Sequence, residues 1–248
     1  MNRKYGWRPS LPDIRDYKFA APRGVKLPAQ FTLLPKSPPV YDQGGLGSCN
    51  SNAIAGAIEF DQRKQKIQEF VPSRLFIYYN ARALEGTVKY DSGAYIRDGI
   101  KAVAKQGVCP ETEWAYIEKK FAKKPPTPCY THALQHTITK YEAVPQNLAK
   151  IKSALYTGSY VVFGFSVYEA FESDEVARTG ILNLPTANEE FMGGHAVCLA
   201  GWNDTTKRFL VRNSWGATFG QAGWFTMPFD YVVNPDLASD FWVIYLTN

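Results

Sequence analysis

The sequence predicts an α+β protein with two lobes, a helical lobe followed by a β-rich lobe. From residue 49 to about 108 the apolar side chains recur at helical spacing. Beyond residue 137 the chain changes to short β-branched and aromatic runs separated by glycine, asparagine and proline, which is typical of strands. The proline-rich "PPTPCY" at 125–130 separates the two patterns and marks a lobe boundary. A cleft between two such lobes is a natural place for a functional site.

Composition excludes several classes of protein. The 248 residues are 45% hydrophobic and 15% aromatic, which is enough to bury a substantial core. The net charge of +5 is modest, and the densest basic stretch, "EKKFAKK" at 118–124, is interrupted and fits a solvated face, so no nucleic-acid partner is expected. The N-terminus lacks the apolar core of a secretory signal, and no apolar run approaches the roughly 20 residues of a membrane helix. We therefore expect no membrane partner, a cytoplasmic location by default with other compartments left open, and a monomer by default.

The first lobe, predicted over 27–136, follows an extended arm of residues 1–26 that is rich in proline, arginine and aromatics. Its helical runs include "SRLFIYYNARALEG", ending at Gly86, and "SGAYIRDGIKAVAKQG", ending at Gly107, as helices often end at glycine. The second lobe, predicted over 137–248, contains the strand-like runs "SYVVFGFSVY", "GGHAVCLAGW", "RFLVRNSWG" and "DFWVIYLTN".

The stretch "QGGLGSCNSNAIAGAIEF" places a single thiol where a glycine loop turns into a helix. Ser48 is a plausible N-cap, and a helix N-terminus stabilises a thiolate, so the pKa of Cys49 is expected to fall and the thiol to become nucleophilic. The alternative is a buried and inert cysteine, which is a common fate of free cysteine.

A nucleophilic cysteine needs a base, and the base needs an orienting group. His195 stands on a glycine turn that leads into a probable strand, and Asn213 ends the strand "RFLVR". Two neighbouring strand ends could hold the imidazole and the amide together. Taken alone, His195 is more simply a core histidine and Asn213 a turn residue.

These segments together resemble the papain family of cysteine peptidases. "DQGGLGSC" is similar to the family's glutamine–loop–cysteine segment, with six residues from Gln43 to Cys49 as in the family. "GGHAVCLAGW" resembles its histidine strand, and "VRNSWGATFGQAGWFTM" its asparagine segment. "LPAQF" at 27–31 resembles the usual mature start, so the resemblance covers about 27–248.

The resemblance implies a papain-like fold, with a helical lobe, a β-barrel-like lobe and an active-site cleft between them. It implies that Cys49 is the nucleophile, His195 the base and later the acid, and Asn213 the residue that orients His195. Gln43 would donate to the oxyanion, and Trp215 would shield the histidine–asparagine bond. The remaining substrate-binding positions it implies are Ser92, Gly93, Gly164, Phe165, Gly193 and Gly194. The resemblance implies no cofactor, and peptides or proteins as substrates.

Several positions depart from the family pattern. Leu46 stands where many members have a disulfide-forming cysteine, Asn50 replaces the usual tryptophan, and Gly194 replaces a frequent Asp or Asn. The missing disulfide fits a divergent, disulfide-poor branch in which the four cysteines stay free. Asn50 and Gly194 leave the substrate contacts and the pH profile open.

Cys109, Cys129, His132 and His136 are residue types that bind zinc, and "CYTHALQH" resembles half of a zinc motif. However, Cys109 and Cys129 lie 20 residues apart rather than in a C-x₂₋₄-C pair, so the sequence predicts no metal site. Whether these two cysteines pair in an oxidising compartment stays open.

The arm is shorter than the usual inhibitory propeptide. We hypothesise that residues 1–26 act as a latch or short propeptide with Trp7 and Tyr17 as anchors; a tail that packs on the surface for stability is the alternative.

The predicted function is a papain-like endopeptidase that acts through a thioester acyl-enzyme. Its alternatives are a catalytically silent peptide-binding module and an acyltransferase that uses the same site.

Overall fold

The computed structural model describes residues 4–246, so the first three residues of the predicted arm and the last two of the second lobe lie outside it. The helices are α1 Cys49–Gln65, α2 Arg74–Glu85, α3 Ile96–Gln106, α4 Thr127–Ala133, α5 Leu148–Tyr156, α6 Asp174–Thr179 and α7 Phe229–Val233, with short 3-10 turns at Leu34–Lys36, Glu118–Lys120 and Glu169–Glu172. The strands are β1 Gln30–Thr32, β2 Ile138–Ala143, β3 Val161–Tyr168, β4 Phe191–Asn203, β5 Arg208–Arg212, β6 Trp224–Pro228 and β7 Ala238–Leu246.

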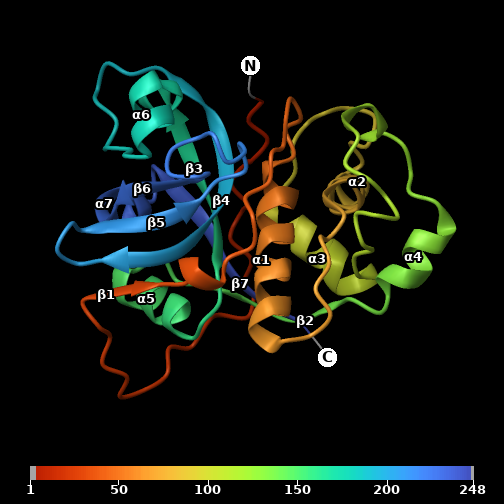
Figure 1. Cartoon of the computed structure of the whole chain (residues 1–248), viewed down its shortest axis with the longest axis horizontal. Helices are drawn as coiled ribbons and strands as arrows, with labels where there is room; N and C mark the ends of the chain where they lie inside the picture. Colours follow the sequence, from red (N-terminus) through yellow and green to blue (C-terminus); the bar gives the residue numbers. More distant parts are fainter. Residues whose placement is uncertain (1–3, 247–248) are drawn as a thin grey trace.

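Two lobes meet along α1. Figure 1 shows α2, α3 and α4 on one side of α1 and α5, α6 and α7 with most of the strands on the other, while β2 passes to the side of α3. Nearly every residue of α1 from Cys49 to Gln62 is buried, because the helix is covered by helices on one face and by β4 and β7 on the other. Phe60 of α1 stacks on Tyr160 with ring centroids 4.1 Å apart, which joins the helix to the β-rich lobe. The predicted α+β class is confirmed.

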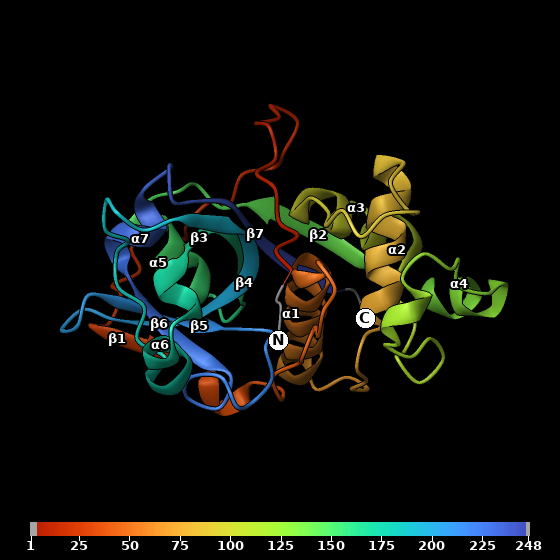
Figure 2. The ribbon, with the colours of Figure 1, turned by 90° about the horizontal axis from the view of Figure 1, so that it is seen from above.

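The sheet of the second lobe is antiparallel, with strand order β2-β7-β3-β4-β5-β6 and β1 paired to β4. The resemblance implied a β-barrel-like lobe, but among residues 4–246 the sheet is open, because β2 and β6 end it without pairing to each other. β2 instead extends from β7 toward the helical lobe and packs against α3 (Figure 2). The C-terminal strand β7 is thereby enclosed between β2 and β3.

The glycine stops predicted from the sequence are confirmed. α2 is followed by Gly86 at φ +71°, and α3 by Gly107 at φ +71°. A Cβ on Gly107 would also lie 1.6 Å from the carbonyl oxygen of Ala133, so only glycine fits there. This turn therefore fixes the loop after α3 against the end of α4.

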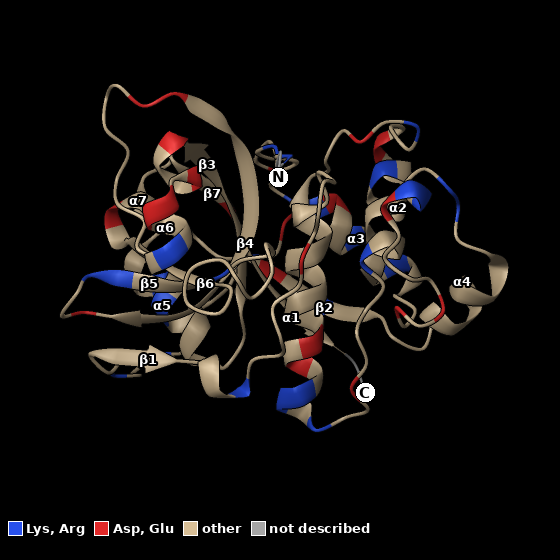
Figure 3. Cartoon of the chain, turned by 45° about the horizontal axis from the view of Figure 1, so that its top comes forward, with Lys and Arg blue, Asp and Glu red and all other residues tan. Residues whose placement is uncertain are grey.

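Lysines and arginines are interspersed with acidic residues over both lobes (Figure 3). The basic stretch at 118–124 forms a 3-10 turn followed by a loop and is mostly exposed, as a solvated face should be. Within residues 4–246, no helix has the combined length and apolar character needed to cross a bilayer.

Candidate active site

Cys49 is the first residue of α1, directly after the glycine loop, and it is fully buried. The sequence predicted this position at a helix N-terminus. Ser48 occupies the N-cap position, but its side chain makes no capping hydrogen bond. Its hydroxyl instead lies 2.6 Å from the hydroxyl of Tyr116 and accepts from Nδ2 of Asn52 at 3.0 Å. The serine therefore joins the loop to the helical lobe rather than capping α1.

His195 and Asn213 meet through the pairing of two strands. His195 lies on β4 and Asn213 directly follows β5, and the register Cys198↔Arg212 brings the two side chains together. His195 Nε2 lies 2.8 Å from Oδ1 of Asn213, and both residues are buried. The ring of Trp215 covers the imidazole, with centroids 5.2 Å apart. Such a covered hydrogen bond is strengthened by the low local dielectric.

The thiol lies beside the histidine strand. The backbone N–H groups of Ala196, Gly6 and Asn50 hydrogen-bond the Cys49 sulfur and favour its thiolate, but burial outweighs them and raises the pKa of Cys49. The sequence predicted a lowered pKa. The pKa is raised rather than lowered because the thiol is fully buried. The N-terminal arm, which includes Gly6, covers the thiol and removes it from water.

Gln43 reaches the same cleft. Its Nε2 donates to the carbonyl oxygen of Leu46 at 2.9 Å and, more weakly, to that of Lys4 in the arm at 3.4 Å. Oε1 of Gln43 accepts from the hydroxyl of Ser214 at 2.7 Å, and the backbone N–H of Gln43 donates to the Ser214 carbonyl at 2.8 Å. Ser214 therefore positions the amide. The sequence analysis did not identify it, although it stands within the quoted "NSWG".

In Figure 2 the arm runs between the helical lobe and the β-rich lobe, next to α1. The Gly6 carbonyl accepts from the backbone N–H of Ala94 at 3.0 Å, and the Trp7 N–H donates to the Gly194 carbonyl at 2.9 Å. The arm is thus held by the backbones of both walls, as an added strand would be. A Cβ on Gly6 would lie 1.8 Å from the carbonyl oxygen of Gly47, so the passage admits only glycine at this point.

Glycines line the walls that face the arm. A Cβ on Gly93 would lie 1.9 Å from the Gly6 carbonyl oxygen, and one on Gly193 would lie 2.6 Å from Cβ of Tyr5. Across the cleft, the Trp7 indole packs on Gly164 and Gly194, where added Cβ atoms would lie 1.9 Å from its ring and 2.3 Å from the Trp7 carbonyl oxygen. These four glycines, all of them predicted substrate-binding positions, therefore contact the arm.

The other predicted positions lie behind these walls. Phe165 is fully buried and packs edge-on to His195, with centroids 5.8 Å apart, beneath the cleft. Ser92 donates its hydroxyl to Thr87 within its own loop at 3.0 Å. Trp215 is 4% exposed and contacts both His195 and Tyr5 of the arm.

Acidic residues that the sequence analysis did not identify hold the arm along its length. Asp91 pairs with Lys4 at 3.0 Å, Glu172 accepts from the Tyr5 hydroxyl, and Glu85 pairs with Arg8. Asp240 accepts both from Nε1 of Trp7 at 3.1 Å and from the Ser10 N–H at 2.8 Å. No local sequence pattern marks these residues, because each acts on a partner far away in the chain.

The two expected anchors of the arm differ. Trp7 is 7% exposed and inserted in the cleft, whereas the Tyr17 side chain is 78% exposed. The arm is held near Tyr17 through its backbone, because the Tyr17 carbonyl accepts from the Ala143 N–H at 2.7 Å at the end of β2. The prediction that the Tyr17 side chain anchors the arm was therefore wrong.

Comparisons with known proteins agree with this geometry. Residues 34–239 match the family described as papain family cysteine protease. An uncharacterised peptidase C1-like protein of Acanthamoeba polyphaga mimivirus is 42% identical over 98% of this chain and 87% of its own. Xylellain, a cysteine protease from Xylella fastidiosa, is 44% identical, and its crystal structure superimposes with a TM-score of 0.94 over 100% of this chain and 99% of that chain. Bromelain from Ananas comosus, 20% identical, shares the fold with a TM-score of 0.69 over 89% of this chain and 100% of its own.

Proposed function

The chain belongs to the papain family of cysteine proteases, and on that premise we propose that it cleaves peptide bonds through a thioester formed on Cys49. The observation that carries this proposal is the imidazole of His195, held by Asn213 at 2.8 Å, on the strand whose next residue, Ala196, directs its backbone N–H at the Cys49 sulfur at the N-terminus of α1. His195 takes the thiol proton, and the sulfur attacks the substrate carbonyl carbon. His195 then protonates the leaving amine, and water that it activates hydrolyses the thioester.

In this mechanism Gln43 stabilises the oxyanion. Its Nε2 and the backbone N–H of Cys49 donate to the oxygen that becomes negative in the tetrahedral intermediate. Its contact with the carbonyl oxygen of Lys4, at 3.4 Å, supports this role, because that carbonyl stands where a substrate carbonyl could be received. Ser214 fixes the orientation of the amide so that the NH₂ group, and not the oxygen, faces the cleft.

The substrates proposed are extended peptide segments. The Ala94 N–H and the Gly194 carbonyl bind the arm's backbone, and these groups are equally able to bind the backbone of a peptide. The glycines of both walls let a chain approach closely, which suits an extended peptide backbone.

The arm is proposed to act as a latch that keeps the enzyme inactive until it is displaced. It covers Cys49 and occupies both walls of the groove. The Gly6 N–H reaches the sulfur, and the Gly6 carbonyl is held by the Ala94 N–H at 3.0 Å. These contacts support a bound segment that blocks the approach of a substrate to the thiol.

The test compares peptidase activity among single variants of the full chain. Gly6→Ala is expected to raise activity, because its Cβ cannot fit against Gly47 and the arm must leave, while Ile14→Ala trims a fully exposed side chain of the same arm and serves as the control. Adding Cys49→Ala to the activated chain should abolish turnover, and adding Gln43→Ala should lower kcat by about 10²–10³-fold.

Activity that survives Cys49→Ala would overturn the catalytic proposal. Equal activity of the wild type and Gly6→Ala, with Cys49 still required, would overturn only the latch.

A further inference from the structure

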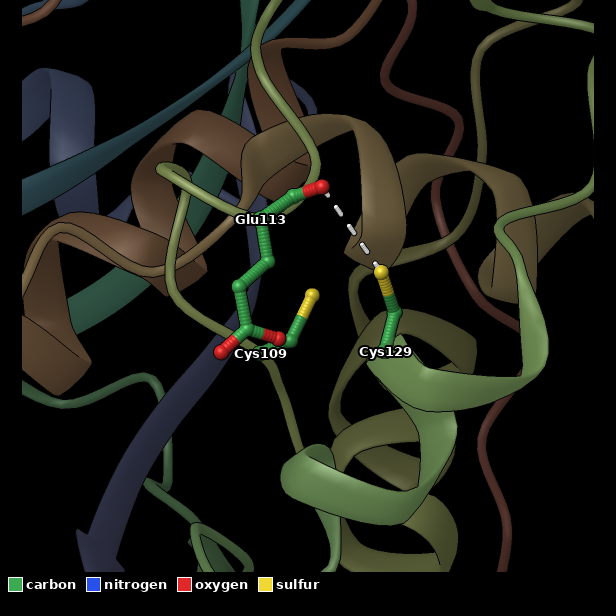
Figure 4. Close-up of side chains that lie close together, drawn as sticks. All are labelled: Cys109, Glu113 and Cys129. Carbon is green, nitrogen blue, oxygen red and sulfur yellow. Dashed lines mark hydrogen bonds between the residues drawn. The ribbon is translucent and has the colours of Figure 1, made fainter.

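A second group of reactive side chains lies outside the cleft, between the loop after α3 and the helix α4. Ligand atoms of Cys109, Glu113 and Cys129 all lie within 4.8 Å of one another. Figure 4 shows the two sulfur atoms turned toward the same space, with the Glu113 carboxylate beside Cys109. Cys109 and Cys129 lie 20 positions apart in the sequence, which opposed a metal site, but folding brings their sulfur atoms within 4.8 Å of each other.

A nitrogen ligand stands at the edge of this group. His132 is three residues after Cys129 and therefore on the same face of α4. Its Nδ1 lies 2.9 Å from Oε1 of Glu113. Two short pairs, Cys109 with Glu113 and Cys129 with His132, thus face each other from two segments, which is how four-ligand zinc sites are commonly assembled.

The burial of the group also suits an ion. Cys109 and Cys129 are 0% and 3% exposed, whereas the side chains of Glu113 and His132 are 31% and 52% exposed. The sulfurs would bind from the protein side, and the carboxylate and imidazole leave a route from solvent. The Cys129 sulfur donates a long hydrogen bond, 3.8 Å, to the Glu113 carbonyl oxygen, and the Cys109 and Cys129 thiols hydrogen-bond each other. A disulfide would use the two sulfurs alone, whereas an ion would also use Glu113 and His132.

We propose that Cys109, Glu113, Cys129 and His132 bind one divalent cation of zinc type. Thiolate and imidazole ligands favour Zn²⁺ over Mg²⁺ or Ca²⁺, which prefer all-oxygen sites. Each thiol gives its proton to solvent when the ion binds, and no atom is oxidised or reduced. The imidazole turns from its contact with Glu113 to the ion, about 2 Å from its nitrogen.

Binding of the ion would stabilise the local structure of the helical lobe. The Cys109 carbonyl accepts from the backbone N–H of Ser73 at 2.9 Å, and the Ser73 hydroxyl donates to the Trp114 carbonyl at 2.7 Å. Ser73 is the N-cap of α2. The ion would therefore join α4, which follows a proline-rich loop, to the loop that holds the start of α2. This site is independent of the proposed catalysis.

The experiment uses the full chain with Cys49→Ala, so that the catalytic thiol cannot bind the ion, kept reduced with a phosphine. Zn²⁺ is titrated by calorimetry, and Co²⁺ is titrated with the visible absorption of thiolate-bound cobalt as the readout. We expect one ion per chain and a rise in Tm. Adding Cys129→Ser should weaken Zn²⁺ binding by more than about 100-fold, since loss of even an outer-shell partner costs 10–100-fold.

Controls separate the site from other thiols and imidazoles. Cys198→Ser, another buried cysteine, and His136→Gln, the neighbouring histidine, should leave the affinity unchanged. His132→Gln, at an exposed position that folding tolerates, should weaken binding by about tenfold or more.

Three outcomes would overturn the proposal: no binding of Zn²⁺ at micromolar concentration by the reduced chain, binding that Cys129→Ser and His132→Gln leave unchanged, or cobalt spectra without thiolate absorption. A reduced chain that binds no ion but readily loses two thiol hydrogens on oxidation would identify a Cys109–Cys129 cross-link instead.

Discussion

Cys49 and Cys198 lie on facing elements of the same core and are both fully buried, yet they are covered in different ways. Cys198, on β4, donates its sulfur hydrogen to the Ala53 carbonyl of α1 at 3.2 Å, and burial raises its pKa to about 12. Burial also raises the pKa of Cys49, but the backbone N–H groups of Ala196, Asn50 and Gly6 oppose this shift. A fixed core covers Cys198, whereas a segment from the chain terminus covers Cys49.

The two covers differ in how firmly they are held. The contact of α1 with β4 around Cys198 belongs to the main core. The arm inserts Trp7, but beyond it Leu11, Ile14 and Tyr17 are 84%, 101% and 78% exposed. In two of its charged pairs, Lys4 with Asp91 and Arg8 with Glu85, the cation of the arm is 60% and 42% exposed, and exposed pairs contribute little stability. Burial alone therefore does not distinguish an inert thiol from a protected nucleophile; the removability of the cover does.

The largest expected effect is on thiol labelling. Gly6→Ala should speed alkylation of Cys49 by about 100-fold, since each ~1.4 kcal/mol of lost arm docking is worth tenfold. Labelling of Cys198 should stay as slow as in the wild type, because its cover is unchanged. Intact mass and peptide mapping after a timed pulse with iodoacetamide measure both rates. Equal acceleration at the two cysteines would show that the variant loosens the whole fold instead.

A smaller effect concerns the pH at which Cys49 reacts. Burial disfavours the thiolate and raises the pKa of Cys49, so removing the arm should shift the onset of alkylation to lower pH. The reactive species is the thiolate, so the rate near neutral pH rises in the same sense. The measurement is the rate of Cys49 labelling against pH in Gly6→Ala and in the control Ile14→Ala. An unchanged onset in Gly6→Ala would mean that the arm limits access without altering the thiol.

The smallest expected effect is at Cys198. Cys198→Ala removes one buried sulfur and its contact with Ala53, and should lower the free energy of unfolding by about 1 kcal/mol. Peptidase activity of the Gly6→Ala chain should not change when Cys198→Ala is added. Urea denaturation and a peptidase assay check the two parts. A loss of activity comparable to that of Cys49→Ala would contradict the division between the two thiols.

Much of the candidate site could be predicted because it rests on local rules. The glycine loop before α1 and the helical spacing after it place Cys49, and the ends of two strands place His195 and Asn213. The stops at Gly86 and Gly107 follow from the left-handed backbone that glycine adopts most easily. These features depend on neighbours in the chain, which a sequence displays directly.

The short helices of the second lobe were harder to predict from the sequence. α5 is capped by Asn147, whose side chain accepts from two backbone N–H groups, and α6 is capped by Ser173, whose side chain accepts from the Val176 N–H. Helices of nine and six residues carry too few turns for a clear apolar period, and their stability comes from packing on the sheet.

By itself the sequence determined which residues could do the chemistry: a thiol at a helix start, an imidazole and an amide at strand ends, and a glutamine six residues before the thiol. Only the tertiary structure decided the state of that thiol and the partners of the remaining cysteines. The path of the arm depends on Asp91, Glu85 and Asp240, and the Cys109–Cys129 group depends on the position of α4. The physical reason is that burial and long-range pairing are properties of the folded surfaces, and a local pattern contains neither.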